Sequence, residues 1–328
     1  MLGYKLKRTK IGGKWNDEWV LTNDRRFRDT PIAKITRRDV IDLLEKIVDR
    51  GSRYQARKVF AILSKLFNWA LLRDAYGFET SPVARIRHTD ILGKFMPRSR
   101  VLSDNELSAV WIAAEQTGYP FGTLVQMLML TGQRLREVSN AKWTEISEQG
   151  DVLLIPASRM KAKIAHSVPL PSRAKELLDA VPQFNDGDRA KGDTFIFSTT
   201  AGKRPLSGFA KMKERLDNSV KRTAEGAGKE SLRNMPRWTL HDIRRTVRTR
   251  MSSLGVLPLV AELVIGHKQT GIQAVYDLHT YDREKRAALR LWQEQLMTIV
   301  KRPVSPPDNI IMLYPTPSTN SRADVANT

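Results

Sequence analysis

The segment Phe121–Leu130 constrains the fold of this chain more than any other feature. Most of its residues are apolar and none is charged. A helix that is apolar all the way round has to be covered on every side, and this one is too short to cross a bilayer. It therefore predicts a buried helix inside a globular domain. Thr131 and Gly132 are expected to end this helix just before Arg134.

Other patterns predict a mainly helical chain with a small β-sheet. Val152–Ile155 and His166–Leu170 resemble short strands, and a basic turn, Ser158–Lys163, separates them. Thr239 caps a helix that ends at Gly255, and Pro258 fits the first turn of the next helix. Helices are also expected from Ser103 onward and over residues 171–180, 206–220 and 271–300, with an extended piece at 195–198 and a loop at 223–229.

Residues 1–92 predict a small, separate helical domain. Thr36 and Asp39 fit a capping box ahead of a helix that stops at Gly51. A second helix is expected from Arg53 to Asp74, with an apolar side and an opposite basic side. The candidate DNA-binding residues there are Arg53, Arg57, Lys58 and Lys65. We expect a linker over 93–100, a second domain over 101–300 and a disordered tail over 301–328.

The charge balance indicates a polyanionic partner. The chain has 55 Lys and Arg against 35 Asp and Glu, a net charge of +20. Residues 1–90 hold 20 basic and 11 acidic side chains, which leaves 35 and 24 for the remainder, so both parts are basic. Two basic parts suit a clamp around nucleic acid, because neutralising phosphates releases counterions. A merely soluble basic protein is the weaker alternative.

The sequence also limits which cellular compartment and which cofactors we expect for this protein. It has no cysteine, which excludes disulfides and thiolate metal ligands. Its basic start leads into no apolar run of the kind that a signal peptide or a membrane span needs. No histidine-rich metal-ligand spacing occurs. We expect a soluble, cytoplasmic protein with no membrane association, no metal and no cofactor.

Six dispersed residues have the chemistry to cut a phosphodiester without a metal ion. They are Arg134, Lys161, His241, Arg244, His267 and Tyr276. Arginine can replace a metal because its planar guanidinium binds two phosphate oxygens and stays charged. Tyr276 would attack phosphorus with His241 as its base. Lys161 would protonate the leaving sugar oxygen, and His267 would bind a non-bridging oxygen.

The order of these residues resembles the signature of the tyrosine recombinases, and in particular of prophage and genomic-island integrases. The matching motifs are Thr131-Gly-Gln-Arg-Leu-Arg-Glu137, Leu240-His-Asp-Ile-Arg-Arg-Thr246, Leu263-Val-Ile-Gly-His267 and Tyr276 nine residues later. By this resemblance Glu137 supports the first arginine, and Lys161 is the lysine of the family's β-turn. The helical segment 30–92 resembles the family's core-binding domain more weakly.

The resemblance implies a helical, SAM-like core-binding domain and an α+β catalytic domain that together clamp duplex DNA. Such an enzyme cuts DNA through a 3′-phosphotyrosine bond, exchanges strands in a homotetramer and reseals them without ATP or metal. It would integrate or excise a mobile element at attachment-type sites, with DNA-bending or excision proteins as accessory partners. Integrases of this group usually carry a further N-terminal arm-binding domain, which we expect this chain to lack.

Two assignments have rivals in the sequence. Tyr281 lies five residues beyond Tyr276 and so on a different face of the expected helix, and the spacing from His267 favours Tyr276. Lys163 competes with Lys161, from which it is two residues away in the same basic turn. We prefer Lys161 because it matches the Met-Lys pair of related turns.

Other polar residues near the motifs are given lesser roles. His166 is expected to make a structural hydrogen bond. Arg245 and Arg248 are expected to contact phosphate or to form a solvated face, and neither is expected to be catalytic.

Two other functions remain open from the sequence. A type IB topoisomerase shares similar residues and the same covalent chemistry, but relaxes supercoils without pairing sites. A catalytically inactive remnant that only binds DNA is the alternative that is not an enzyme. Plasmid relaxation would identify the first, and tight DNA binding without a covalent adduct would identify the second.

Overall fold

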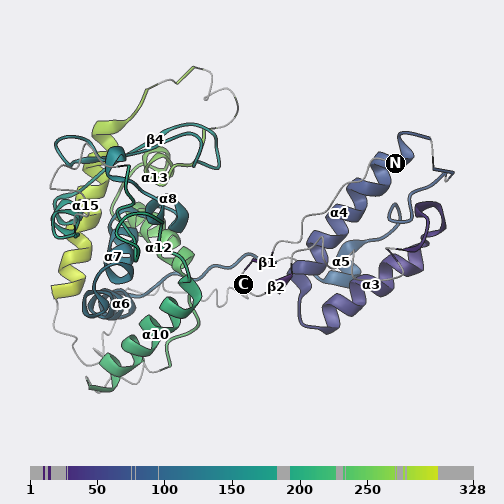
Figure 1. The fold of residues 1–328 in the computed structure, drawn as a ribbon, viewed down its shortest axis with the longest axis horizontal. Helices are drawn as coiled ribbons and strands as arrows, with labels where there is room; N and C mark the ends of the chain where they lie inside the picture. The colour runs from purple at the N-terminus through teal and green to yellow at the C-terminus, as the bar shows by residue number, and fades with distance from the viewer. Residues whose placement is uncertain are drawn as a thin grey trace, which may run out of the picture. The chain divides into compact units, whose positions relative to one another are not determined.

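A computed structural model of the chain describes residues 10–11, 14–15, 27, 29–74, 76–77, 79–94, 96–182, 193–226, 232, 234–269, 271, 276–277 and 279–301 (Figure 1). The chain divides into two compact units, Met1–Arg98 and Ser99–Thr328. The division falls within the segment 93–100, for which the sequence predicts a linker. Each unit buries its own cluster of hydrophobic side chains, as independently folded units do.

The first unit is built on two helices, α3 (Arg37–Asp49) and α4 (Arg53–Leu71). α3 begins at the predicted capping box, in which Thr36 and Asp39 each accept the backbone N–H of the other. α4 packs along α3, and the short α5 (His88–Leu92) packs against both. α4 ends before the predicted Asp74, whose φ of +47° is incompatible with a helix.

The smaller elements of this unit are β1 (Lys10–Ile11) and β2 (Lys14–Trp15), which pair antiparallel, and the 3-10 turn η1 (Ile32–Lys34). Its core comes almost entirely from the helices. The buried apolar side chains there include Leu44, Ile47, Leu63, Phe67 and Leu92.

The second unit is organised around α7 (Phe121–Thr131), which confirms the predicted buried helix. Every residue of α7 except Thr123 is buried. α7 packs against α6 (Asp104–Thr117), α9 (Ser172–Asp179), α12 (Leu240–Ser253) and α15 (Asp282–Lys301). The Trp292 indole N–H donates to the Met129 carbonyl at 2.7 Å, which ties α15 to this centre.

Further elements complete this unit. They are α8 (Leu135–Ser139), η2 (Trp143–Glu145), β3 (Val152–Ile155), β4 (His166–Pro169), α10 (Phe209–Gly226) and α13 (Pro258–Val264). β3 and β4 form an antiparallel hairpin with Ile155 opposite His166. Figure 1 shows β4, α13 and α8 at the same end. The mainly helical fold with a small sheet is thus confirmed.

The predicted helix over residues 271–300 is not continuous. Tyr276 is helical, but residues 279–281 are not, and α15 begins at Asp282 because Tyr281 has a φ of +52° that breaks a helix. The Asp277 carboxylate accepts the backbone N–H of His279 and the hydroxyl of Tyr281 just before α15. Residues 272–275 and 278 of this prediction lie outside the described residues. Residues 301–328 of the predicted disordered tail lie outside the described residues apart from Lys301.

The predicted helix 206–220 and the loop after it are both displaced. Leu206 donates its N–H to the Phe197 carbonyl in an extended segment, so α10 begins at Phe209. α10 then continues to Gly226, and the Thr223 hydroxyl donates back to the Ser219 carbonyl as in a helix. The predicted loop 223–229 is therefore helical as far as Gly226, and its last three residues lie outside the described part of the chain.

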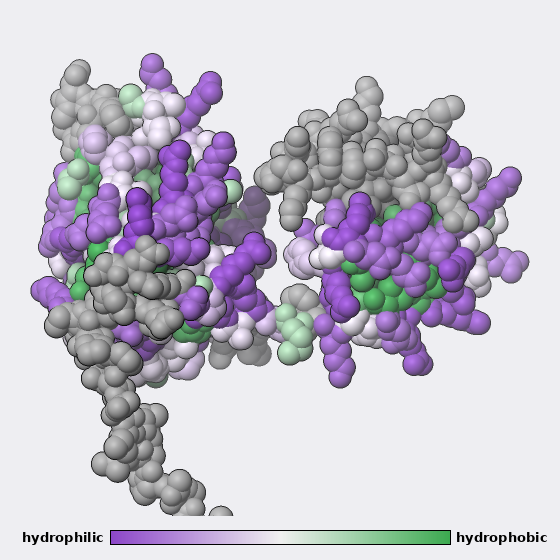
Figure 2. All heavy atoms as spheres, turned by 90° about the horizontal axis from the view of Figure 1, so that it is seen from below, coloured by the Kyte–Doolittle hydropathy of each residue, from purple (hydrophilic) through white to green (hydrophobic). Residues whose placement is uncertain are grey.

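Hydrophilic side chains dominate the face drawn in Figure 2. Exposed large apolar side chains include Tyr54, Trp69 and Leu72 on or just after α4. None of the helices in the described part of the chain is both long enough and apolar enough to cross a bilayer.

Candidate active site

Arg134 stands where α7 gives way to α8. α7 ends at Gly132, whose φ of +66° lies in the left-handed region, and Arg134 is the N-cap residue of α8. The Glu137 carboxylate accepts the Arg134 backbone N–H at 3.0 Å and its Nη1 at 2.7 Å. Glu137 is buried, so a carboxylate shielded from water orients this guanidinium.

Arg244 reaches the same loop from α12. A Cβ on Gly132 would lie 2.9 Å from Cγ1 of Val247, so only glycine lets the loop approach α12 this closely. Nη1 of Arg244 donates to the Gly132 carbonyl at 3.1 Å. Within the described part of the chain, its buried Nη2 has no hydrogen-bond partner. A buried donor of this kind suits an anion that binds there.

Arg244 remains positively charged although it is buried. Its side chain is buried, with 4% of the residue exposed. Burial, followed by the charge of Arg134, lowers the pKa of Arg244 to about 10. The guanidinium is therefore still a cation at neutral pH, in surroundings where its attraction for a phosphate is little screened.

His241 lies one turn before Arg244 on α12. Its pKa is lowered, first by partial desolvation and then by the charges of Arg244 and Arg245. A lowered pKa favours the neutral imidazole at pH 7, which is the form that accepts a proton.

A cavity of about 580 Å³ gathers predicted residues from three separate segments. Its lining includes Arg134 before α8, Lys161 between β3 and β4, and His267 after α13. Lys163 is not among its lining residues, and its φ of +57° marks the turn as irregular. The cavity therefore favours Lys161 over its rival.

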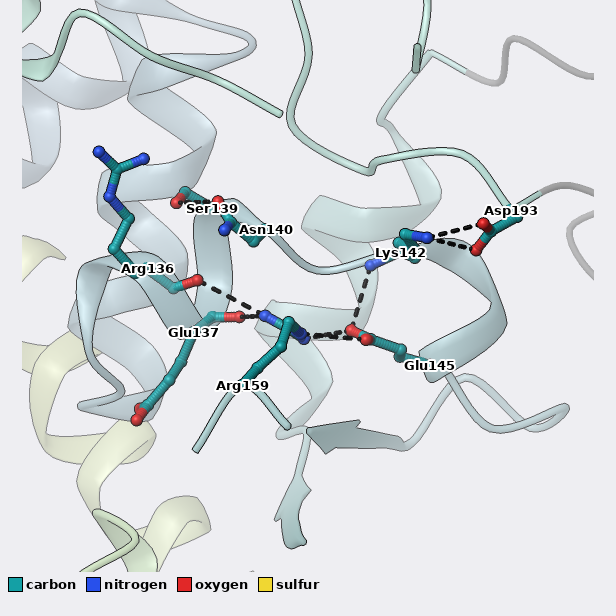
Figure 3. A network of polar contacts seen from close by, with 8 residues as sticks. All are labelled: Arg136, Glu137, Ser139, Asn140, Lys142, Glu145, Arg159 and Asp193. Atoms are coloured by element: carbon teal, nitrogen blue, oxygen red, sulfur yellow. Dashed lines mark hydrogen bonds and ion pairs between the residues drawn. The ribbon is translucent and has the colours of Figure 1, made fainter. Parts of the chain in front are cut away.

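Arg159 anchors the connection that carries Lys161. Its Nη1 donates to the Glu137 carbonyl at 2.8 Å, and its Nε donates to the Glu145 carboxylate at 3.2 Å (Figure 3). Figure 3 shows the Glu137 carbonyl facing Arg159 while the Glu137 carboxylate points away from it. Glu137 thus links Arg134 on one side with the Lys161 connection on the other. Arg159 was not predicted as a site residue, and its only signal in the sequence is its place in the basic turn.

His166 makes the predicted structural hydrogen bond. It is buried, and its Nε2 lies 3.2 Å from the Val264 carbonyl at the end of α13. Burial, followed by the charge of Lys285, lowers the pKa of His166 to about 4. The ring is then neutral, and Nε2 must carry the proton because a carbonyl only accepts. Gln133 donates to the same carbonyl at 2.8 Å.

Tyr276 is a predicted catalytic residue that the structure does not bring to the cavity. It is 81% exposed and is not among the residues that line the cavity. Its neighbours 272–275 and 278 lie outside the described residues. Tyr281, its rival, packs against the core and donates to Asp277 at 2.8 Å. That hydrogen bond raises the pKa of Tyr281, which makes its phenol a poorer nucleophile.

The candidate DNA-binding residues differ in how they are engaged. Arg53, Lys58 and Lys65 are exposed on α4. Arg57 instead donates to the Leu92 carbonyl at 2.8 Å and to the Gly93 carbonyl. Arg245 in the second unit pairs with Asp242 and donates to the Arg100 carbonyl at 3.4 Å. Arg57 and Arg245 thus have contacts within the protein that the sequence did not predict.

Metal ligation finds no support in the described side chains. Among them, no group of three or more His, Asp or Glu residues is placed to hold a metal ion. The polar groups of the cavity are mainly cationic donors, which suit a phosphate better than a metal.

Comparison with known proteins assigns the family. Residues 100–283 match the Phage integrase family, which consists of tyrosine recombinases. The match covers more than half of the chain, so this protein belongs to the phage integrase family. The resemblance found in its motifs is thereby confirmed.

Individual relatives agree with this assignment. The prophage integrase IntZ of Escherichia coli (strain K12) is 28% identical over 271 residues, which are 82% of this chain and 62% of IntZ. The chain therefore spans less than two thirds of that relative.

Solved structures share the fold. A lambda integrase tetramer bound to a Holliday junction aligns with a TM-score of 0.54 at 21% identity, over 73% of this chain and 66% of that one. The Tn1549 transposon integrase in complex with circular intermediate DNA aligns with a TM-score of 0.59 at 17% identity, over 82% and 89%. At these identities the likeness establishes the fold alone.

Proposed function

We propose that this chain is a site-specific DNA recombinase that cuts and rejoins DNA through a bond between Tyr276 and a 3′-phosphate. One observation carries the proposal: Arg134, Lys161 and His267, from three distant segments, line one cavity. The buried Arg244 bonds to the loop that carries Arg134. Cations held in place before the reaction suit a substrate whose negative charge grows in the transition state.

The proposed reaction moves protons between the protein and the DNA without a net gain or loss in each step. The Tyr276 oxygen attacks phosphorus and gives its proton to His241, and the bond from phosphorus to the 5′ oxygen breaks. Lys161 protonates that departing oxygen. Arg134 and Arg244 hold the non-bridging oxygens. In the reverse step, a free 5′-hydroxyl attacks the phosphotyrosine, whose bond stores the energy for rejoining.

The exposed position of Tyr276 requires a movement on DNA. Its phenol is open to solvent and does not line the cavity. In the proposal, binding of the duplex brings the Tyr276 segment to the scissile phosphate beside the two arginines. Lids and loops that complete a site only on substrate binding are common in enzymes.

The proposed partner is duplex DNA at attachment-type sites. The net charge of +20 favours a polyanion, and residues 1–92 would act as the core-binding domain through Arg53, Lys58 and Lys65. Lambda integrase as a tetramer on a Holliday junction motivates the proposal of a homotetramer. IntZ is a prophage integrase, which motivates integration or excision of a mobile element, with accessory DNA-bending proteins, in the cytoplasm.

A trapped covalent adduct tests the nucleophile. Binding sites are first selected from random duplexes, and a nick is then placed next to the cleavage point so that the cut fragment diffuses away. Wild type and Tyr281→Phe are expected to accumulate a denaturation-resistant adduct, and Tyr276→Phe none, because it lacks the attacking oxygen. Gel electrophoresis of labelled DNA measures the yield.

The other outcomes are equally informative. An adduct with Tyr276→Phe as abundant as with wild type refutes the assignment of the nucleophile. Tight binding by wild type without any adduct indicates a protein that only binds DNA. Relaxation of a plasmid that lacks the selected site indicates a topoisomerase.

A further inference from the structure

Glu262 in α13 connects the candidate site to a part of α12 that the proposed mechanism does not use. Its Oε1 accepts from Nε of Arg248 at 2.8 Å. Its Oε2 pairs with Nδ1 of His267. Both carboxylate oxygens are thus engaged, one by each neighbour. Glu262 also lines the same cavity as Arg134 and His267.

The backbone brings His267 back over Glu262. Gly266 follows the end of α13 with a φ of +67°, and its N–H donates to the Leu263 carbonyl at 3.0 Å. The N–H of His267 donates to the Glu262 carbonyl, also at 3.0 Å. These two bonds form a Schellman cap, in which the second residue past the helix returns to its last turn. Glu262 and His267 are therefore joined through both backbone and side chain.

The chemistry of the pair determines where the imidazole proton sits. Burial alone would raise the pKa of Glu262, but the hydrogen bonds from Arg248 and His267 outweigh it and the pKa is lowered. Glu262 is then an ionised carboxylate at neutral pH, which only accepts hydrogen bonds. Nδ1 of His267 must therefore carry a proton.

The other ring nitrogen of His267 is left for the substrate. Within the described part of the chain, Nε2 of His267 makes no hydrogen bond. The imidazole is partly exposed, with 46% of its side chain accessible. Because a histidine held at one nitrogen presents the other in a fixed orientation, Nε2 is the atom left for the substrate. A phosphate oxygen only accepts hydrogen bonds, so Nε2 binds it as an N–H donor, in the ring that carries a proton on each nitrogen.

We infer that Glu262, itself fixed by Arg248, is a positioning residue: it accepts the hydrogen bond from Nδ1–H of His267 and so directs Nε2, as an N–H donor of the doubly protonated ring, to the scissile phosphate. This inference rests on the proposed function for its substrate, but the state of the His267 ring is a property of the protein alone. The carboxylate acts through His267 and does not itself contact DNA.

Nitrogen-15 spectra of the full chain test the ring directly. The chain has five histidines, so His267→Gln assigns the signal of His267 in a histidine-labelled sample. Long-range proton–nitrogen spectra of the neutral ring are expected to show the proton on Nδ1 in wild type. In Glu262→Gln, whose amide can donate to Nδ1, the proton is expected to shift at least partly to Nε2. A matched control is Glu176→Gln, which removes an exposed carboxylate paired with Arg173 at 2.8 Å.

Adduct formation under single-turnover conditions tests the consequence. Glu262→Gln is expected to slow it about 10- to 100-fold, as loss of an orienting partner of a functional histidine typically does, with DNA affinity unchanged. The double variant Glu262→Gln/His267→Gln is expected to be no slower than His267→Gln, because the carboxylate acts only through the ring. Glu176→Gln should match wild type. If Glu262→Gln does not fold, Arg248→Lys tests the same network, with a smaller slowing expected.

Either measurement can overturn the inference. A neutral wild-type His267 ring whose proton lies on Nε2 and not on Nδ1, or a His267 signal unaffected by Glu262→Gln, refutes it. Rate losses that multiply in the double variant also refute it, because Glu262 would then act independently of His267. If wild type forms no adduct at all, the proposed function fails, and the spectra still decide the inference.

Discussion

At the scale of single residues, the candidate site depends on a guanidinium held where solvation is weakest. Arg244 is almost fully buried, and its Nη1 bonds to the Gly132 carbonyl at 3.1 Å. Leaving a second donor of a buried arginine unpaired is unfavourable for folding. Native proteins retain such groups mainly at functional positions. A bound phosphate would supply the acceptor that Nη2 lacks among the described residues.

The role of Lys161 as a general acid can be tested with one substitution and one modified substrate. Lys161→Ala is expected to slow cleavage about 100-fold, within the usual range for a general acid. Replacing the 5′ bridging oxygen of the substrate by sulfur is expected to restore most of the rate, because a thiolate leaves without being protonated. Single-turnover rates on both substrates measure this. Lys163→Ala, which alters a lysine outside the cavity lining, is the control and should leave both rates near wild type.

The result that contradicts this role is equally clear. If sulfur substitution accelerates Lys161→Ala no more than wild type, Lys161 does not protonate the leaving group, and its contribution is one of charge alone.

At the scale of elements, the ends of α12 and α13 have the same kind of cap in different packing environments. α12 ends at Ser253 and is followed by Gly255, with a φ of +79°; α13 ends at Val264 and is followed by Gly266, with a φ of +67°. Both ends have the hydrogen bonds of a Schellman cap. A Cβ on Gly255 would meet nothing within 4 Å, whereas one on Gly266 would lie 3.0 Å from the His166 ring and from Met160. Only the second cap is packed against the site.

These two glycines make a matched pair of variants. Gly255→Ala is expected to lower the free energy of unfolding by about 1 kcal/mol, the strain of a left-handed alanine. Gly266→Ala is expected to lower it by a further 1 kcal/mol or more, roughly the effect of overpacking a filled space. It should also slow adduct formation, since His267 is the next residue. Urea unfolding and single-turnover cleavage measure both effects. Equal losses of stability and rate in the two variants would contradict the packing argument.

At the scale of the whole molecule, the second unit is held together by contacts between distant segments. His166 in β4 bonds to the Val264 carbonyl at the end of α13, and Gln133 after α7 bonds to the same atom. The hairpin, the α7–α8 loop and α13 therefore meet at one carbonyl group. The stability of this junction depends on His166 remaining neutral.

Acid is expected to weaken this junction. The pKa of His166 is about 4 in the folded protein, below its ordinary value of about 6.5, so the unfolded chain binds a proton that the folded chain does not. The contribution of neutral His166 to the free energy of unfolding is complete above pH 6.5 and is lost as the pH falls towards 4. The shift corresponds to about 3 kcal/mol.

Unfolding free energies of wild type and His166→Gln at pH 7 and pH 4 measure this effect. Glutamine can still donate to the Val264 carbonyl but does not titrate. Wild type is expected to lose about 3 kcal/mol more than the variant over this range. Identical losses in the two proteins would mean that His166 does not couple stability to pH.

The sequence by itself determined the features that depend on local chemistry. The apolar run Phe121–Leu130 could only be a covered helix, and the capping boxes at Thr36, Ser103 and Thr239 fixed three helix starts. The order of Arg134, His241, Arg244 and His267 was enough to indicate the family and the kind of site.

Only the tertiary structure decided how those residues are held and paired. Tyr281 breaks the predicted C-terminal helix through a positive φ, which no hydrophobic pattern records. Arg159 donates to the Glu145 carboxylate and to the Glu137 carbonyl, and Arg248 donates to Glu262. These partners are far apart in the sequence, and no helical or strand periodicity relates them. Such pairs form because the packing of the core brings their segments together. Their partners therefore follow from the fold and not from the neighbouring sequence.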